Sequence, residues 1–324
     1  MDVIRPNPPE QAARERQLSP AARHALHSVA MMVGVALAFL LSMGGGPVAV
    51  WGKTAGLFAS RPNAELSAEL SETSLDRQRP QKQAELLLER AVSHSDGDPN
   101  LIEAQIESRI DAWRGQLQWD EQLGDLTTVA LNSNDQSVRA SAIEVQLAAY
   151  GLTKTESTVD ALARQADSRD HQKKIWALWA LGLLGNRGVE PEHVVQVLAA
   201  HLKDSGKDKR KEKEEEDSRR WAVEGLALVG TTPTIAPLLE AMHNDPSPTV
   251  REHAACSLAA SGMLSPKQRL IAVPQLINYS ADPALDAQTR SWAFRALGDI
   301  TKQHLPNDSE AWRNWYETSV ASGQ

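Results

Sequence analysis

The sequence contains a single cysteine, Cys256, among 324 residues, so no disulfide can form within the chain. This excludes the small disulfide-stabilised scaffolds and leaves the redox compartment open. Phe and Tyr are also scarce, with three of each, whereas there are nine Trp. Hydrophobic residues at 41% and charged residues at 23% are nevertheless typical of a protein that folds around a buried core.

The sequence also lacks the motifs of common catalytic and metal centres. The nine His are scattered, and no His-x-x-x-His motif or paired cysteines supply metal ligands. There is no Gly-x-Ser-x-Gly motif and no phosphate-binding glycine loop before a soluble helix. Cys256 follows two alanines and is interpreted as a buried thiol rather than a nucleophile. We therefore expect no enzymatic activity, no metal and no cofactor.

Clustered positive charge is missing as well. The formal net charge is −8, which does not favour binding to a phosphate backbone, so we expect no nucleic-acid partner. A charged insertion at 203–218 has a basic half followed by an acidic half, and the two largely cancel. We interpret it as a solvated loop or a helix extension, with a nucleic-acid or targeting patch as the alternative.

A long segment without charge lies near the N-terminus. From Ala25 to Gly52 there is no Lys, Arg, Asp or Glu, and the densest apolar part is VAMMVGVALAFLLSM at 29–43. About 20 apolar residues are enough to cross the hydrocarbon core of a bilayer. Trp51 stands where an interfacial aromatic residue is expected. The pattern predicts one transmembrane helix at 25–52, after a polar tail that we expect to be disordered.

Two other interpretations of this segment stay open. A cleaved signal peptide fits less well, because the polar lead is long and no small-x-small cleavage site follows Met43. A buried soluble helix is the third, although long charge-free runs are rare in such helices. Three Arg at 14–23 precede the segment, whereas Lys53 and Arg61 follow it. For a single-pass anchor, this bias favours a cytoplasmic N-terminus and a large domain on the opposite side of the membrane.

After the linker, from about residue 81 on, the chain has apolar residues at helical spacing and no stretch that alternates with period two, which predicts helices. One helix is expected at 84–93, one continuous helix at 99–117, and a last one around WRNWYE at 312–317. The two Trp of this last segment predict a helix that covers the end of a stack.

A pattern recurs after five basic residues. An Ala follows three positions after each, a Leu seven positions after four of them, and a Gly eleven positions after three of them, including Gly185, where we expect the helix to close. Offsets of three and seven share one helical face, and an apolar segment precedes each pattern. Pro237 and Pro274 occupy corresponding positions in two of those segments and predict kinks. Such helix pairs must stack to bury their apolar faces. The five basic residues are Arg139, Lys174, Arg219, Arg251 and Arg290.

These residues resemble the HEAT repeat family. The best match is IAPLLEAMHNDPSPTVREHAACSLAASG at 235–262, with a proline in the first helix, an Asp in the turn and Val-Arg in the second helix. Gln146 departs from the pattern, which has Leu at its position. In the family, an Asp of the turn and an Arg of the second helix form a ladder between repeats. The resemblance implies a ladder here from Asp135 with Arg139, Asp245 with Arg251, and Asp286 with Arg290.

The resemblance implies an all-α fold, a right-handed α-α superhelix of the HEAT or armadillo type, preceded by the transmembrane helix. The expected organisation is a tail at 1–24, the membrane segment at 25–52, a linker at 53–81, a degenerate helical pair at 82–118, repeats at 119–303 with the insertion at 203–218, and a capping helix with a tail at 304–324.

Four Trp are the candidate partner-binding residues. Trp176, Trp221 and Trp292 each come two positions after the basic residue of their unit, and Trp179 is three positions beyond Trp176. In HEAT-like stacks the second helices line the concave surface, so these rings are candidates for a binding wall, where aromatic residues supply much of the affinity. Packing between neighbouring second helices is the open alternative.

Together these patterns favour a membrane-anchored protein-interaction scaffold or adaptor, which binds a protein or peptide of unknown identity and has no catalytic activity of its own. Two alternatives stay open. Some HEAT-like proteins resemble lyases that attach pigments to light-harvesting proteins, which would imply a lyase or chaperone-type activity. A purely structural role in an envelope complex is the other.

Overall fold

The computed structural model describes residues 75–93, 98–203 and 211–321. Every regular element in these ranges is a helix and none is a strand, which confirms the predicted all-α fold. The predicted tail and membrane segment, and the linker up to residue 74, lie outside the described residues. Among the helices that are described, none is both long and apolar enough to cross a bilayer. The chain divides into two compact units, Met1–Leu152 and Thr153–Gln324, called here the N-terminal and the C-terminal unit.

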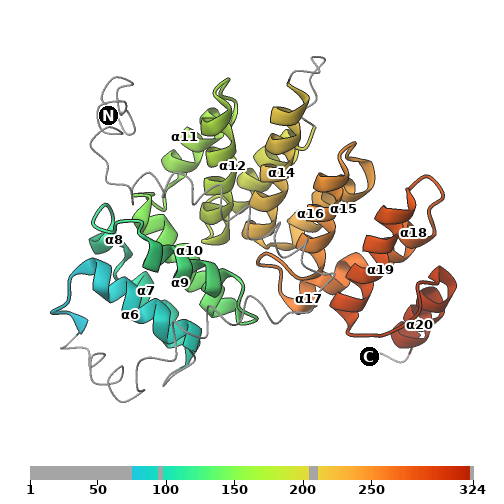
Figure 1. Ribbon diagram of the computed structural model, residues 1–324, viewed down its shortest axis with the longest axis horizontal. Helices are drawn as coiled ribbons and strands as arrows, with labels where there is room; N and C mark the ends of the chain where they lie inside the picture. The colour runs from blue at the N-terminus through green and yellow to red at the C-terminus, as the bar shows by residue number, and fades with distance from the viewer. Residues whose placement is uncertain (1–74, 94–97, 204–210, 322–324) are drawn as a thin grey trace. The chain divides into compact units, whose positions relative to one another are not determined.

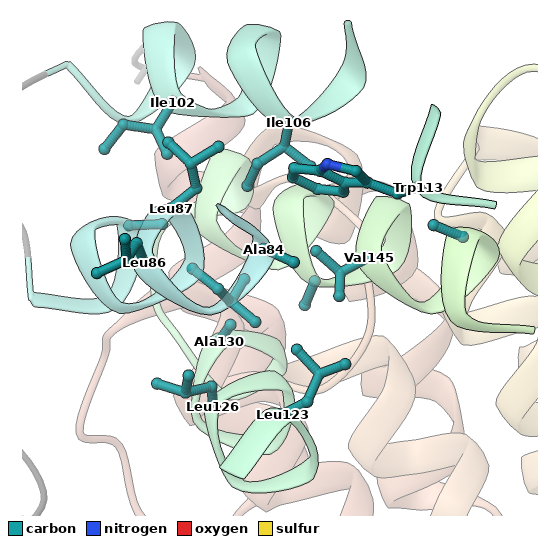
Figure 2. Packing of buried hydrophobic residues seen from close by; sticks show 14 of the residues in the cluster. Ala84, Leu86, Leu87, Ile102, Ile106, Trp113, Leu123, Leu126, Ala130 and Val145 are labelled. Atoms are coloured by element: carbon teal, nitrogen blue, oxygen red, sulfur yellow. The ribbon is translucent and has the colours of Figure 1, made fainter. Parts of the chain in front are cut away.

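The described residues of the N-terminal unit are built around α6, which contacts the four other helices described there. Its core is formed by aliphatic side chains around the ring of Trp113 (Figure 2). The indole of Trp113 is 1% exposed, and its Nε1 donates a hydrogen bond to Gln83 Oε1 at 2.8 Å. The helices are α6 (Pro80–Ser93), α7 (Pro99–Glu107), α8 (Ile110–Trp113), α9 (Glu121–Leu131) and α10 (Gln136–Ala149).

The prediction of one continuous helix at 99–117 is wrong, because the chain turns at Ser108 and Arg109 between α7 and α8. Both side chains donate to Gln105 O, from Ser108 Oγ at 2.9 Å and from Arg109 Nη1 at 3.0 Å. These bonds satisfy a carbonyl at the end of α7 to which no backbone N–H of a further helical turn donates. The turn allows Ile106 and Trp113, on different helices, to enter one core.

Helices α9 and α10 pack with α6–α8, so the N-terminal unit continues past residue 119, where the repeats are expected to begin, and ends at Leu152. Helix α10 is buried nearly all round, as expected of a helix that contacts four others. Gln146 stands on α10 at the position where the repeat pattern has Leu, and it is 0% exposed. Neither of its amide atoms has a hydrogen-bond partner among the described residues. Such a group destabilises a core by about 1–3 kcal/mol.

In its described residues, the C-terminal unit has four helix pairs followed by a last helix (Figure 1). The second helices of the pairs contact one another in succession, α12 with α14, α14 with α16, and α16 with α19. The first helices lie on the other side of each pair, so the unit has two layers of helices. The pairs are α11 (Glu156–Ala166) with α12 (His171–Asn186), α13 (Pro191–His201) with α14 (Glu212–Val229), α15 (Ile235–Asn244) with α16 (Pro248–Ala259), and α18 (Val273–Ala281) with α19 (Ala287–Thr301); α20 (Ser309–Ala321) follows.

The second helices α12 and α14 approach each other through glycines. A Cβ atom built on Gly182 would lie 2.7 Å from Gly225 O, and one built on Gly225 would lie 2.7 Å from Leu178 O. Only a residue without a side chain allows the two backbones this close. Gly185 lies inside α12, which ends at Asn186, so the expectation that it closes the helix is wrong. Gly230 does end α14, in the left-handed conformation.

Short 3-10 turns precede two of the first helices. Turn η1 (Thr232–Thr234) leads into α15, whereas α17 (Pro266–Arg269) and η2 (Leu270–Ala272) lead into α18. The prolines predicted to kink these helices, Pro237 and Pro274, instead lie in their first turns. There a missing amide hydrogen costs nothing, because the first N–H groups of a helix have no partner within it.

The start of α14 is formed by acidic residues of the charged insertion. The acidic half of the insertion forms the first turns of α14, so this part is a helix extension, with Glu212 and Glu214 in the first turn at the positive end of the helix dipole.

At the end of the chain, α20 packs on α18. Trp312 is 1% exposed, and its Nε1 donates a hydrogen bond to Pro306 O at 3.0 Å. Helix α20 thus covers the last pair, as the sequence predicts.

Replacing Gly225 with Ala tests the glycine contact. The added methyl group would collide with Leu178 O and with Leu198 Cδ2, so we expect Gly225→Ala to lower the free energy of unfolding by about 1–3 kcal/mol. Gly298→Ala is the matched control in the same unit, because its nearest atom, Gln303 O, would be 3.5 Å away. The control should stabilise by up to about 1 kcal/mol. Urea unfolding followed by circular dichroism measures both, and equal effects would contradict the close contact.

Candidate functional site

The four second helices of the C-terminal unit present one recurring face. Positions two and five after each basic residue are neighbours on a helix, because they are three residues apart. We call the residues at these positions the second-helix face. They are Trp176, Trp179, Trp221, Glu224, His253, Cys256, Trp292 and Arg295.

The candidate Trp residues differ in their accessibility. Trp221 and Trp292 are each only 9% exposed, as packing between helices requires. The guanidinium of Arg220 lies 5.1 Å from the ring centroid of Trp221, within the range of a cation–π interaction. Trp176 and Trp179, both on α12, are half-buried and keep part of their rings in solvent. The structure therefore restricts the accessible aromatic surface among the four candidates to α12.

His253 occupies on α16 the position that Trp holds on α12, α14 and α19, and the sequence reasoning missed it. Its Nδ1 lies 2.6 Å from Glu224 Oε1 on α14, so the two residues connect neighbouring pairs. The side chain is buried, and Nε2 has no hydrogen-bond partner among the described residues. The signal that could have found it is its offset of two from Arg251, the same as for the three Trp.

Cys256 also lies on the second-helix face. Burial raises the pKa of its thiol, and the carboxylates of Glu252, Glu224 and Asp299 add to this effect, whereas Arg295 opposes it. The neutral thiol is therefore favoured over the reactive thiolate. Within the described ranges, no group of three or more His, Cys, Asp or Glu is arranged to hold a metal ion.

Behind this face, two ion pairs connect successive helix pairs. Arg219 on α14 donates to Asp245 through two nitrogens, with Nε to Oδ2 at 2.7 Å and Nη2 to Oδ1 at 3.3 Å. The side chains are 8% and 2% exposed. Asp245 Oδ1 also accepts from the Ser247 amide at 2.8 Å, which holds the turn before α16. The carboxylate of this turn is thus paired with the Arg of the preceding pair.

The same arrangement recurs one pair further along. Arg251 Nη2 lies 2.7 Å from Asp286 Oδ2, and Arg251 Nε donates to Thr289 Oγ1 at 3.0 Å. Arg251 meets its own Asp245 only at the backbone, where Nη1 donates to the carbonyl oxygen at 2.7 Å. Asp286 caps α19 by accepting from the Thr289 amide at 2.8 Å. This amide, and then the Thr289 hydroxyl and the Arg251 charge, lower the pKa of Asp286.

The remaining ladder residues make local bonds. Asp135 caps α10 by accepting from Ser137 N at 2.8 Å, while Arg139 Nη1 donates to Ser133 O at 2.5 Å. Burial lowers the pKa of Arg139, and the charge of Asp135 opposes this effect. Arg290 donates to the carbonyls of Asp282 and Leu285 in its own turn. The ladder, defined as Arg219–Asp245 with Arg251–Asp286, therefore spans α14 to α19.

The paired helices and the ladder lie within the part of the chain that a comparison with known families recognises. Residues 210–298 match the family model of HEAT repeats. This match and the all-helical pairs support a HEAT-repeat protein with an α-solenoid fold. The matched HEAT repeats extend from just before α14 into α19 and include both rungs of the ladder. No curated protein matches the chain.

The two rungs of the ladder should differ in their contribution to stability. Asp245→Asn leaves the charge of Arg219 buried without its carboxylate, so we expect a loss of about 3 kcal/mol or more. The side chain of Asp286 is 50% exposed, and Asn can still cap α19, so Asp286→Asn should cost less than about 1 kcal/mol. Chemical unfolding of both variants measures the difference. If Asp245→Asn lowers the free energy of unfolding no more than Asp286→Asn does, the buried Arg219–Asp245 pair does not contribute more to stability than the exposed pair.

Proposed function

We propose that the protein is a membrane-tethered HEAT-repeat scaffold that binds a protein or peptide along its second-helix face. The observation that carries this proposal is the succession of α12, α14, α16 and α19 (Figure 1). Two Trp on α12 are partly exposed. HEAT repeats commonly mediate protein–protein interaction, and the match over 210–298 supports the same role here.

Trp176 and Trp179 are the proposed contact residues. They lie three residues apart on α12, so their side chains emerge from one side of the helix. A partly exposed indole offers a large, rigid apolar surface with few rotatable bonds, and Trp is strongly enriched among the residues that dominate binding energy. The half-buried Ile175 beside them adds apolar surface. A partner with apolar side chains that can cover the two rings fits this surface.

Membrane tethering rests on the sequence at 25–52. This segment has no charged residue and is long enough to span the hydrocarbon core. The excess of Arg before it supports a cytoplasmic N-terminus, which would place the HEAT repeats on the opposite side of the membrane. A scaffold held at the membrane would concentrate its partner there, because tethering confines both to one surface.

Alanine substitution at the two accessible Trp tests the binding face. The test uses a protein that co-purifies with the unaltered full chain. We expect the chain with Trp176→Ala and Trp179→Ala to retain its helicity and to bind this protein about tenfold or more weakly. Quantitative capture from membranes of the source cells, followed by titration of the captured protein, measures the loss. Trp315→Ala is the control, because this half-buried Trp lies on α20. Undiminished affinity in the double variant would contradict the proposed face.

Membrane fractionation tests the tether separately. The full chain should remain in the membrane fraction through alkaline extraction, because a spanning helix is held by the hydrophobic effect and not by charge. A chain without residues 25–52 should be released to the soluble fraction. Release of the full chain by alkali, or membrane retention of the shortened chain, would contradict a tether at this segment.

A further inference from the structure

A histidine connects the last two helix pairs of the C-terminal unit on the side of the first helices. His243 lies in the last turn of α15, and Asp282 immediately follows α18. His243 Nε2 is 2.8 Å from Asp282 Oδ2, and the two side chains are 26% and 28% exposed. The contact joins residues 39 positions apart in the chain. It is thus a link between successive repeats and not a contact within one helix.

Both nitrogens of the His243 ring face oxygen atoms. While Nε2 faces the Asp282 carboxylate, Nδ1 lies 2.6 Å from Asn244 Oδ1. A neutral imidazole has one N–H donor and one lone pair, so it can donate to only one of two acceptors. The imidazolium has two N–H donors and satisfies both oxygens. The geometry of the site is therefore matched to the protonated form of His243.

Tyr279 holds the imidazole ring in place. The two ring centroids are 4.7 Å apart with an interplanar angle of 40°. The Tyr279 hydroxyl donates to Leu239 O on α15 at 3.2 Å, a second bond between α18 and α15. The π-electrons of the Tyr279 ring attract the imidazolium form of His243 more strongly than its neutral form.

The hydrogen bonds around the pair favour the ionised form of both side chains. The hydrogen bonds to Asn244 and Asp282 raise the pKa of His243, and burial opposes them only in part. The bond to His243 and that from the Ala284 amide lower the pKa of Asp282, with a smaller contribution from Arg290 on α19. Glu240, one turn before His243 on α15, acts on Tyr279 and adds negative charge to the surroundings.

The other close histidine–carboxylate pair of the unit differs in a decisive respect. His253 meets Glu224 through Nδ1, but its buried Nε2 has no partner among the described residues. That second ring nitrogen therefore has no oxygen atom in the described part of the chain to which it could donate. Of these two histidines, only His243 has an oxygen atom facing each of its ring nitrogens.

We propose that His243, Asp282 and Tyr279 form a proton-dependent clasp between the α15–α16 and α18–α19 pairs, closed when the imidazole is protonated. Closure fixes the first helices of these two repeats against each other. Deprotonation removes the ionic attraction, and the neutral ring can then donate to only one of its two oxygen acceptors. This device concerns the stiffness of the repeat junction and does not depend on the proposed partner.

The pH range of the clasp follows from the two pKa directions. The pKa of His243 is raised above 6.5, so its stabilisation is complete below pH 6.5 and is lost as the pH rises through the raised value. The pKa of Asp282 is lowered below 3.8, so its stabilisation is complete above pH 3.8 and is lost as the pH falls through the lowered value. The clasp is fully closed between these two pH values.

Histidine titration by nuclear magnetic resonance on the full chain tests the clasp directly. The His243 signal, assigned with His243→Asn, should titrate with a midpoint above 6.5. Asp282→Asn should move this midpoint down, because it removes the carboxylate. A midpoint at or below 6.5 in the unaltered chain, or no change in Asp282→Asn, would overturn the proposal.

Stability measurements give an independent test. We expect Asp282→Asn to lower the folding equilibrium constant about two- to fivefold at pH ~5.5, and to have almost no effect at pH ~8.5, where His243 is neutral. Comparing one variant at both pH values cancels the titration of the other histidines. His304→Asn, at an exposed position in the same unit, is the control and should show no difference between the two. An equal effect of Asp282→Asn at both pH values would count against the clasp.

Discussion

No helix pair of this protein can bury its apolar residues alone, and the C-terminal unit is organised by that constraint. The second helices α12, α14, α16 and α19 each lie between neighbours, so their apolar residues are covered on more than one side. The packing is closest between α12 and α14, where Gly182 and Gly225 bring the two backbones into direct contact. The stability of each repeat therefore depends on the repeat beside it, as in other stacked-repeat proteins.

Polar contacts determine how the pairs are placed on one another. Apolar packing is not directional, whereas a two-nitrogen bond from Arg219 to Asp245 has one geometry. The ladder continues from Arg251 to Asp286 through a single nitrogen, so the turns before α16 and α19 are each held by the second helix of the preceding pair. His243 and Asp282 connect the same two repeats that Arg251 and Asp286 connect. One of these links is permanently charged, and the other depends on protonation.

A binding role and a proton-dependent junction are compatible in such a molecule. The proposed contact residues Trp176 and Trp179 lie on α12, the second helix of the first pair, whereas the clasp lies between the third and fourth pairs. In a stack, the placement of each repeat is determined by its neighbours, so a change in one junction alters the surface that several repeats share. A change in the stiffness of one junction would therefore alter the shape of the second-helix face.

The sequence by itself determined the helical fold, the recurring pattern and the covering role of Trp312, because these depend on local spacing of apolar residues. It also located the acidic turn residues and the basic residues of the ladder. It did not predict that Arg219 pairs with Asp245 or that α9 and α10 pack with α6–α8, because both are contacts between segments far apart in the chain. The burial of Trp221 and Trp292, and the partial exposure of Trp176 and Trp179, were decided by tertiary structure alone. Trp176, Trp221 and Trp292 occupy the same position of the sequence pattern, and only the neighbouring helices distinguish a covered ring from an accessible one.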